Sequence, residues 1–434
     1  MDDGHGEPGP LSGPTGSDGR RGGPAPRAAH ADAHAEGTSD AADAASDRSG
    51  GRMGAFAAIS ALFVVIMIGT TLPTPLYVFW QREYTFGSAI TTVVFATYAF
   101  GVLVALLTAG QASDEAGRRP VLAVALVLSF AASIGFAAAD SITVLLVARF
   151  VSGLAAGLTT AAATASLREL AGRDHPEAAA VVPGAVNLFG LGCGPLLAGV
   201  LAELIPGHPT MVPFEVHLVL LVCAALALIP PDTVTAKPKP TWVRRPQIAV
   251  PSHSRWTFWA AALAGLISFA LLGLFTSVIP TFLGQTLHEH RPAVVGTVVF
   301  LLFAAAVVAQ VLCRRVERGT AVRSGLLALP VALALIVAGL YAVSFATFLV
   351  GTVAAGGAVG VVFLGSLDTA LSVAAPDQRG QVGSAYFSSA YVGLTIPVIS
   401  VGFAAQAFGT RPSVLVAAIA LAAAALLAYA RLRP

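Results

Sequence analysis

A polar patch of ten residues, beginning at Gly110, is the densest group of side chains in this chain that could do chemistry. It places the carboxylate Asp114 four residues before Arg118, which Arg119 follows, and Gly117 directly precedes both arginines. A carboxylate can form a charge-assisted ion pair with a guanidinium or bind a helix N-terminus, and glycines permit a tight turn. The pattern predicts an ion-pair latch. The alternative is that the two arginines only anchor a charged turn.

Arg149 is the second candidate, because it is the one lysine or arginine deep within an apolar run of the sequence. An ionisable side chain inside such a run costs free energy and indicates a functional site. If residues 141–167 form a helix, Arg149 lies about 12 Å along its axis at 1.5 Å per residue. The alternative is that its long side chain reaches the nearer surface of the membrane and does no chemistry.

Small residues recur at helical spacing after Arg149 and again in the next apolar run. Gly153 and Gly157 follow Arg149 at intervals of four, and the next run carries a second set: Gly190, Gly194, Pro195 and Gly199. Glycines let a neighbouring helix approach closely, and a proline removes one backbone hydrogen bond and bends the helix. Such a face could seal a cavity between helices against leakage of protons. Ordinary helix packing is the alternative.

Few polar side chains lie inside the apolar runs, and four are candidates for lining a cavity: Tyr98, Asn187, Gln310 and Tyr391. Carboxylates are scarcer still. The first apolar run holds no aspartate or glutamate. Three carboxylates lie at the ends of other runs, where charged groups meet the membrane interface: Asp140, Glu203 and Asp368. The sequence therefore identifies no carboxylate that could carry a proton through the middle of a membrane.

The apolar runs that must position these residues are long enough to cross a membrane. The chain is 56% hydrophobic and 11% charged, whereas soluble domains carry about 25% charged residues. A helix needs about 20 apolar residues to cross the bilayer core. Twelve such runs can be marked: 54–79, 88–109, 120–139, 141–167, 178–201, 214–230, 256–284, 292–313, 324–344, 345–370, 383–406 and 412–430. The predicted fold is an all-α membrane protein with twelve transmembrane helices.

Polar segments divide the chain into four parts. Residues 1–52 contain almost no large apolar side chain, so we predict a disordered tail. Residues 53–230 hold six apolar runs, residues 231–255 form a polar linker, and residues 256–434 hold the other six runs. The sequence thus predicts two six-helix bundles joined by a linker.

The distribution of basic residues predicts the orientation in the membrane. Lysine and arginine gather in the tail, the linker and alternate loops, whereas the remaining loops hold only Arg82, Arg291 and Arg411. Loops rich in basic residues stay in the cytoplasm. We therefore expect a multi-pass protein of the plasma (inner) membrane with both termini and the linker in the cytoplasm.

The two predicted bundles repeat each other at an offset of about 200 residues. Gly153 and Gly157 in the fourth run align with Gly356 and Gly360 in the tenth, whereas the second half has no counterpart of Asp114. Two bundles related in this way place a binding site at their interface, near the middle of the membrane. We expect two pseudo-symmetric six-helix bundles with a latch in one half only.

These motifs resemble those of the major facilitator superfamily. The patch with Asp114 is similar to its motif A, Arg149 with its two glycines to motif B, and the set with Pro195 to motif C, which is associated with drug/proton antiporters. The resemblance implies that Asp114 contacts the inner end of the eleventh run, near Gly380–Ser384, and so stabilises an outward-facing state. It also implies that Arg149 takes part in proton transfer.

The function that this resemblance implies is proton-coupled export of small lipophilic compounds, such as a drug, antibiotic or secondary metabolite, by alternating access. The alternatives are proton-coupled uptake of a small polar solute and a membrane sensor or assembly protein that transports nothing. The expected partners are a small-molecule substrate, protons and the lipid bilayer, and we expect a monomer. No nucleotide-binding loop, nucleophile–base pair or metal-type Cys/His spacing occurs, so the sequence predicts no enzyme, cofactor, metal or nucleic-acid partner.

Overall fold

The computed structural model describes residues 51–109, 112–172, 176–229, 242, 254–286, 289–374 and 379–432. Met1–Gly51 and Arg52–Pro434 are separate units, and the fold is that of the second unit alone. The predicted tail falls almost wholly outside the described residues, as do most of the predicted linker and Gly110 of the polar patch.

Every apolar run forms a helix. The first half contains a helix over residues 51–71, then η1 (Thr74–Leu76), α2 (Tyr77–Glu83), α3 (Ser88–Ala109), α4 (Ala112–Ala116), α5 (Arg118–Ala137), α6 (Ile142–Ala171), α7 (Pro176–Leu204), α8 (Val212–Ala224) and η2 (Ala225–Leu228). The second half contains α9 (Arg255–Ser277), α10 (Ile279–Thr286), α11 (Pro292–Leu312), η3 (Cys313–Arg315), α12 (Arg318–Tyr341), α13 (Phe345–Ser372), α14 (Arg379–Phe408) and α15 (Thr410–Arg431). The described residues include no strand.

The helices confirm the all-α membrane fold that the sequence predicts. Eleven helices in the described part are long and apolar enough to cross a membrane, and Val212–Leu228 is a shorter apolar helix that completes the set. Two expected spans are divided in the structure. The run 54–79 forms the helix over residues 51–71, then η1 and the start of α2. The run 256–284 forms two helices, because α9 ends at Ser277 and α10 begins at Ile279, just before Pro280. Proline has no backbone N–H, so it is tolerated in the first turn of a helix and not in its interior.

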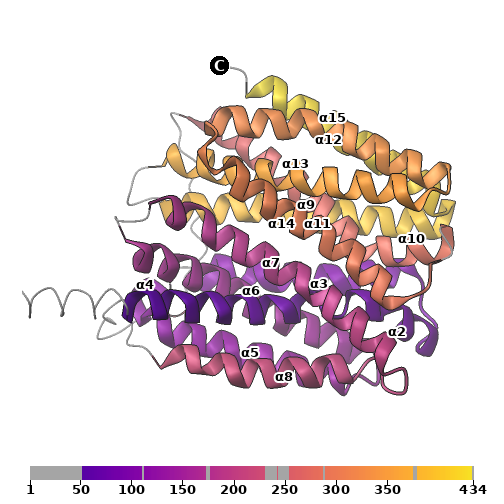
Figure 1. Cartoon of the computed structure of the whole chain (residues 1–434), viewed down its shortest axis with the longest axis horizontal. Helices are drawn as coiled ribbons and strands as arrows, with labels where there is room; N and C mark the ends of the chain where they lie inside the picture. Colours follow the sequence, from indigo (N-terminus) through magenta and orange to yellow (C-terminus); the bar gives the residue numbers. More distant parts are fainter. Residues whose placement is uncertain are drawn as a thin grey trace, which may run out of the picture. The chain divides into compact units, whose positions relative to one another are not determined.

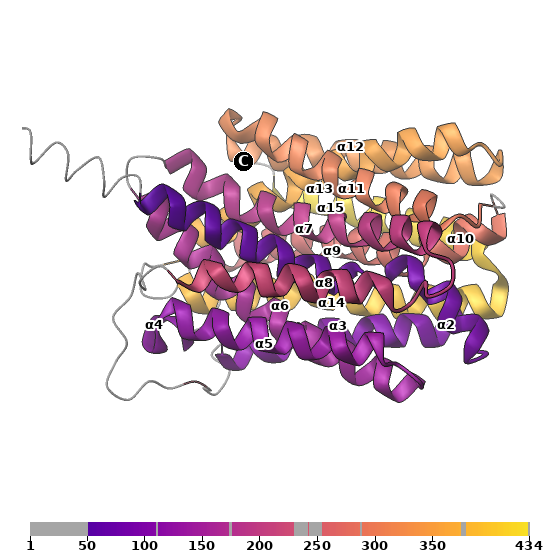
Figure 2. The same ribbon diagram turned by 60° about the horizontal axis from the view of Figure 1, so that its bottom comes forward.

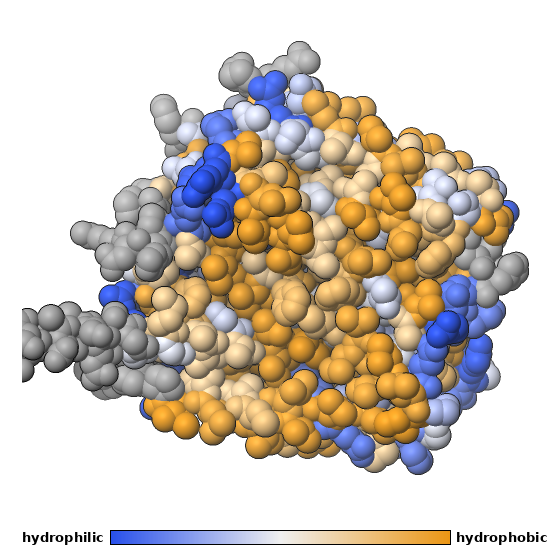
Figure 3. Space-filling view, viewed as in Figure 1, coloured by the Kyte–Doolittle hydropathy of each residue, from blue (hydrophilic) through white to orange (hydrophobic). Residues whose placement is uncertain are grey.

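The surface has the distribution expected of a protein surrounded by lipid. In Figure 3 apolar residues cover the middle of the visible face, and hydrophilic residues gather toward two opposite ends. Large apolar side chains such as Phe100, Val127 and Val331 are 59%, 67% and 63% exposed. A soluble monomer rarely exposes so continuous an apolar surface. The chain is therefore a multi-pass membrane protein.

Each end of the bundle carries a short helix, α4 at one end and α10 at the other (Figure 1). The α4 end holds α4 and the starts of α5, α7 and α14, and the α10 end holds α2, α10 and the starts of α3 and α11. The helices up to α8 form one half and those from α9 onward form the other. The two halves meet where α3 packs on α14 and α7 packs on α11, and α7 and α11 run side by side in Figures 1 and 2.

The internal repeat is visible in how glycines pack the helices of each half. A Cβ added at Gly153 of α6 would lie 2.2 Å from the carbonyl oxygen of Tyr98 in α3. A Cβ added at Gly356 of α13 would lie 2.2 Å from the carbonyl oxygen of Leu302 in α11. Both contacts join the fourth and second spans of their half. Backbones can approach this closely only where one of them carries a glycine. Such close packing matters in a membrane, because the hydrophobic effect does not favour association of helices in lipid.

Substitution of Gly356 tests this contact against a neighbouring control. We expect Gly356→Ala to lower the stability of the protein by about 1–3 kcal/mol, because the added methyl group overpacks a backbone contact. Gly357→Ala is the control, because a Cβ there meets only the side chain of Ala309 at 3.9 Å. The measurement is the thermal unfolding midpoint of both purified variants. Equal midpoints for the two variants would contradict the packing.

Candidate functional site: the cavity between the halves

A cavity of about 430 Å³ lies between the two halves and extends to the α4 end. Its wall is formed by α3 to α7 of the first half and by α11, α13 and α14 of the second. The side chain of Asp114 lies on this wall and is 59% exposed, so the cavity is open to solvent at the α4 end. An interface of two pseudo-symmetric bundles is where such a protein is expected to bind its ligand.

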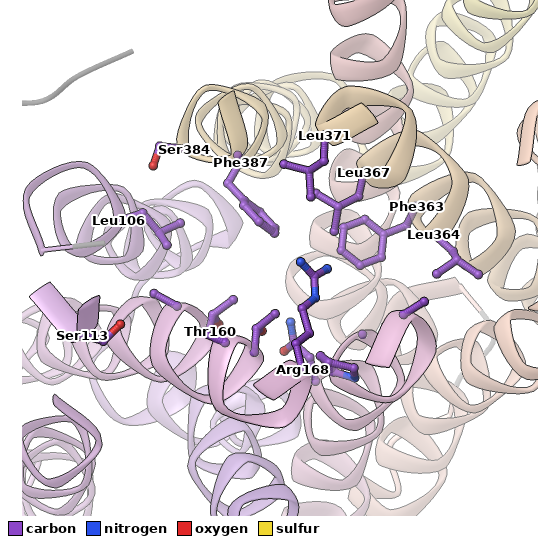
Figure 4. A pocket seen from close by; sticks show the side chains of 18 of the residues that line it. Leu106, Ser113, Thr160, Arg168, Phe363, Leu364, Leu367, Leu371, Ser384 and Phe387 are labelled. Carbon is purple, nitrogen blue, oxygen red and sulfur yellow. The ribbon is translucent and has the colours of Figure 1, made fainter. Parts of the chain in front are cut away.

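The wall of the cavity is largely apolar. In Figure 4, Phe363 and Leu367 of α13 and Phe387 of α14 face Thr160 of α6 across the open space. The guanidinium of Arg168 points from α6 into the same space, toward Phe363 and Leu367. Aromatic and aliphatic walls with few polar groups are typical of sites that bind small molecules.

Charged residues gather at the mouth of the cavity around Arg118. Its guanidinium donates to the hydroxyl of Ser113 at 2.6 Å, to the carboxylate of Asp114 at 2.5 Å and to the carboxylate of Glu169 at 2.7 Å. Gly117 makes this possible, because its φ of 99° turns the chain sharply between α4 and α5. A side chain at that φ would be strained. Arg118 therefore starts α5 and still reaches back to α4.

This arrangement differs in one respect from the contact that the sequence implies. Asp114 pairs with Arg118 of its own half, while Gly383 and Ser384 of α14 line the same cavity. The predicted contact of Asp114 with the start of α14 belongs to a state in which the α4 end is closed, and it stays a prediction. Arg119 is exposed at the start of α5. Glu169, which the sequence did not single out, is the additional member of the cluster.

Arg149 is fully buried, with 0% of its surface exposed, so its side chain does not reach the membrane surface. Its Nε donates to the hydroxyl of Tyr77 at 2.7 Å and its Nη1 to the carbonyl oxygen of Thr70 at 2.5 Å. Its Nη2 has no hydrogen-bond partner among the described residues. The guanidinium carbon lies 5.3 Å from the ring centre of Tyr77 and 5.5 Å from that of Phe136.

The contacts of Arg149 have a local cause. The helix over residues 51–71 ends just after Thr70, and Pro73 and Pro75 follow. Carbonyl groups in the last turn of a helix lack donors from the helix itself, and the negative end of the helix dipole favours a cation there. Arg149 supplies both the donor and the charge. Sequence reasoning missed Tyr77 and Thr70, although the Pro-Thr-Pro break at residues 73–75 marks the place where the first span stops.

The small residues of α7 make two kinds of contact. Cβ atoms added at Gly190 and Gly194 would lie within 2.6 Å of the first span, at the Cβ of Met67 and the carbonyl oxygen of Ile68. A Cβ added at Gly199 would instead lie 2.2 Å from the carbonyl oxygen of Pro292 in α11. The predicted packing face thus contacts the first span along most of its length and the other half at the α10 end.

The two halves are in close contact at the α10 end. A Cβ added at Gly296 of α11 would lie 2.1 Å from the carbonyl oxygen of Pro195, which mirrors the contact of Gly199. Glu203 binds Arg291 of the other half at 2.6 Å, and this hydrogen bond raises the pKa of the Arg291 guanidinium. Ser88 of α3 also donates to the carbonyl oxygen of Gly402 in α14. The halves are therefore in backbone contact at the α10 end, beside a second pocket of about 670 Å³ that Glu203 and His290 line, and the cavity with the amides opens at the α4 end.

The four polar residues proposed from the sequence fall into two groups. Asn187 of α7 and Gln310 of α11 line the cavity. Tyr98 of α3 and Tyr391 of α14 are buried, at 5% and 7% exposure, and their side chains contact each other across the two halves. The tyrosines lie between the cavity and the contacts of the α10 end. The two amides thus lie where a ligand in the cavity would bind. The two tyrosines close the cavity on the side of the α10 end.

Substitution of Gly199 tests whether the glycine contacts hold the α10 end closed. Thr92, on α3 at this end, is 1% exposed and lies against Gly402. We expect Gly199→Leu to push the halves apart, so that Thr92→Cys in a background without the native cysteines reacts about tenfold faster with a maleimide. A bias of about 1.4 kcal/mol, within the usual cost of overpacking, gives that ratio. The control is Gly207→Leu, because nothing lies within 4 Å of a Cβ there. Equal rates in the two variants would show that the contact does not hold this end closed.

Comparison with known proteins gives this architecture a family. Residues 56–398 match the Major Facilitator Superfamily. Over 114 residues the chain is 33% identical to the multidrug resistance protein MdtL of Escherichia coli (strain K12 / DH10B) and to that of Shigella boydii serotype 18. These matches cover 26% of this chain and 28% of each relative. The crystal structure of the human organic anion transporter MFSD10 (TETRAN) covers 88% of this chain and 99% of its own, at 19% identity and a TM-score of 0.63. That likeness shows the fold alone, whereas the family match over most of the chain shows that this protein belongs to the Major Facilitator Superfamily of membrane transporters.

Proposed function

We propose that this transporter exports small, largely apolar compounds by alternating access and that proton influx drives the export. The observation that carries the proposal is the cavity, whose wall is largely apolar and holds, apart from two amides and the hydroxyl groups of serine and threonine, charged residues mainly at its mouth. A lipophilic substrate needs few fixed polar partners and would gain most of its binding free energy from the aromatic and aliphatic wall.

The direction of transport follows from the proposed orientation. Basic residues gather at the α4 end, among them Arg118, Arg168 and Arg314, whereas Arg82, Arg291 and Arg411 belong to the other end. The positive-inside rule supports a cytoplasmic α4 end. The open cavity would then face the cytoplasm, where an exporter takes up its substrate. The names of the curated relatives, multidrug resistance proteins, also favour export.

The same orientation underlies the rest of the proposed arrangement. We propose a monomer in the plasma (inner) membrane with both termini in the cytoplasm, a tail of residues 1–52, bundles over 53–230 and 256–434, and a cytoplasmic linker over 231–255. The substrate, protons and lipid are its proposed partners. The proposed linker is supported by the ends of the spans on either side of it, Leu228 and Arg255.

Proton coupling needs a group that exchanges protons during the cycle. Asp114 and Glu169 are the carboxylates of the described cavity wall, and both pair with Arg118 at its mouth. Two carboxylates expected at helix ends also have partners, because Asp368 binds Arg318 and Glu203 binds Arg291. Arg149 is buried, and its partners among the described residues are a hydroxyl and a carbonyl oxygen, with no carboxylate. We propose that Arg149 serves proton transfer, as the resemblance implies, and that Asp114 serves the latch.

A second candidate function is proton-coupled uptake of a small polar solute. The amides of Asn187 and Gln310 on the cavity wall favour it, because they would suit a polar ligand. The two functions predict opposite effects on accumulation. An exporter lowers the amount of a compound inside the cell, whereas an uptake carrier raises it.

Drug susceptibility of a hypersensitive host tests export and the role of Arg149 together. We expect expression of the chain to raise resistance to at least one lipophilic antibiotic and to lower its accumulation. Arg149→Ala and a protonophore should each return both values to those of the empty host, because each removes proton coupling. Arg431→Ala, which changes an exposed arginine at the end of α15, is the control. If no compound's accumulation falls on expression, the protein is not an exporter of this kind.

Substitution of Asp114 tests the latch. We expect Asp114→Ala to lower the export rate while the protein still folds, because the α4 end loses an ion pair needed for closure. The variant should also remain longer in the state closed at the α10 end, so that Thr92→Cys reacts more slowly than in the parent protein. Asp140→Ala, at an exposed aspartate in the loop between α5 and α6, should change neither value. Export by Asp114→Ala at the parent rate would rule the latch out.

A further inference from the structure

Three buried polar atoms without partners lie on the wall that α7 and α11 form along the cavity. The side chain of Gln310 is 0% exposed, and neither its Oε1 nor its Nε2 has a hydrogen-bond partner among the described residues. The Oδ1 of Asn187 is likewise buried and unpartnered within the described part of the chain. Both residues line the cavity, so these atoms belong to one site.

Unpartnered atoms in such a place require an explanation. A buried donor or acceptor without a partner costs about 1–3 kcal/mol, and the large majority of buried polar groups in proteins are satisfied. The local packing leaves room for the amide of Gln310, because a Cβ added at Gly184 would lie 3.4 Å from its Oε1. These amides bond to no part of the described fold, so the stability of the fold does not account for them. A ligand in the cavity would.

The chemistry of the unpartnered atoms defines that ligand. A glutamine amide offers one acceptor oxygen and an N–H donor group, and the Oδ1 of Asn187 adds a second acceptor. A ligand that satisfies all three atoms must carry both an acceptor and a donor. A carboxamide has both. A carboxylate has no donor and an ammonium group has no acceptor, so each would leave at least one buried atom unpaired.

Most of the charges of the described cavity wall lie away from the amides. Asp114, Arg118 and Glu169 pair with one another at the mouth, and the guanidinium of Arg168 points from α6 toward Phe363 and Leu367. Asn187 lies about 16 Å along α7 from its start at the α4 end, at 1.5 Å per residue. The uncharged part of the wall includes Phe363 and Phe387 on the second half.

We propose that Gln310 and Asn187 together bind the carboxamide group of an uncharged amphiphile, whose apolar body packs on Phe363, Leu367 and Phe387. This inference rests on the proposed function, since the ligand is the transported substrate. Asn187 belongs to the first half and Gln310 to the second, so one small group bridges both halves. Binding of the ligand would thus depend on the relative position of the halves, as alternating access requires.

A set of matched probes tests the proposal on purified protein in lipid nanodiscs. Octanamide, octanoate and octylammonium share one chain length and differ in the head group alone. We expect octanamide to bind more tightly than the other two. Gln310→Leu and Asn187→Leu should each weaken octanamide binding about tenfold, the loss typical of one buried hydrogen bond left unpaired. Phe363→Ala is the control and should weaken all three probes alike, because it shortens only the apolar wall.

A second variant separates binding from a merely structural role. Gln310→Glu keeps the size of the side chain and replaces the donor by a second acceptor, so we expect it to bind octylammonium more tightly than octanamide. The proposal is overturned if the parent protein binds octanoate or octylammonium as tightly as octanamide, or binds none of the three. It is also overturned if Gln310→Leu binds octanamide like the parent, or if Gln310→Glu does not change the preference.

These outcomes are independent of the export assay. Binding is measured on purified protein and does not require transport in a cell. Carboxamide-selective binding without any effect on accumulation would contradict the proposed export and leave the amide site standing. Export together with binding that does not distinguish the three head groups would contradict the amide site alone.

Discussion

Close backbone contact between the halves at the α10 end is the constraint on which the rest of the structure depends. Gly199 meets α11 and Gly296 meets α7 so closely that an added Cβ would lie 2.2 Å or less from a carbonyl oxygen. In lipid, helices gain no hydrophobic free energy by associating, so contact of this closeness is what holds them. Because the backbones touch there, the cavity that reaches the amides of Asn187 and Gln310 lies on the other side of this contact and opens at the α4 end.

Arg149 is explained by the groups that it connects and not by a gain in stability. Its buried guanidinium pairs with no carboxylate and leaves Nη2 without a partner in the described structure. Removing a charge from water without a counter-ion is unfavourable, so Arg149 is poorly explained as a stabilising residue. What it does is hold two groups of the first span, the carbonyl oxygen of Thr70 and the hydroxyl of Tyr77, on either side of a proline-containing break. It thus connects α6 to the point where the first span changes direction.

Much of the fold follows from the sequence, because bilayer length and small-residue spacing act locally along the chain. The twelve apolar runs are helices, and Gly153 with its repeat mate Gly356 marks equivalent contacts in the two halves. The site was less predictable, since rotation of a helix and the conformational state are not encoded in spacing. Asn187 and Tyr391 were equally plausible cavity residues, yet only Asn187 lines the cavity.

The cluster at the α4 end shows why the state matters to such predictions. Motif spacing implies a contact of Asp114 with α14, but the contact that exists depends on whether the halves meet at that end. Arg118 here binds Asp114 and Glu169 at once. If Asp114 turned toward α14, Glu169 would still neutralise Arg118, so the change would leave no guanidinium without a carboxylate. An exchange of ion-pair partners costs little free energy when no charge is left unpaired during it. We therefore expect Glu169, which no motif marks, to determine how easily the latch switches.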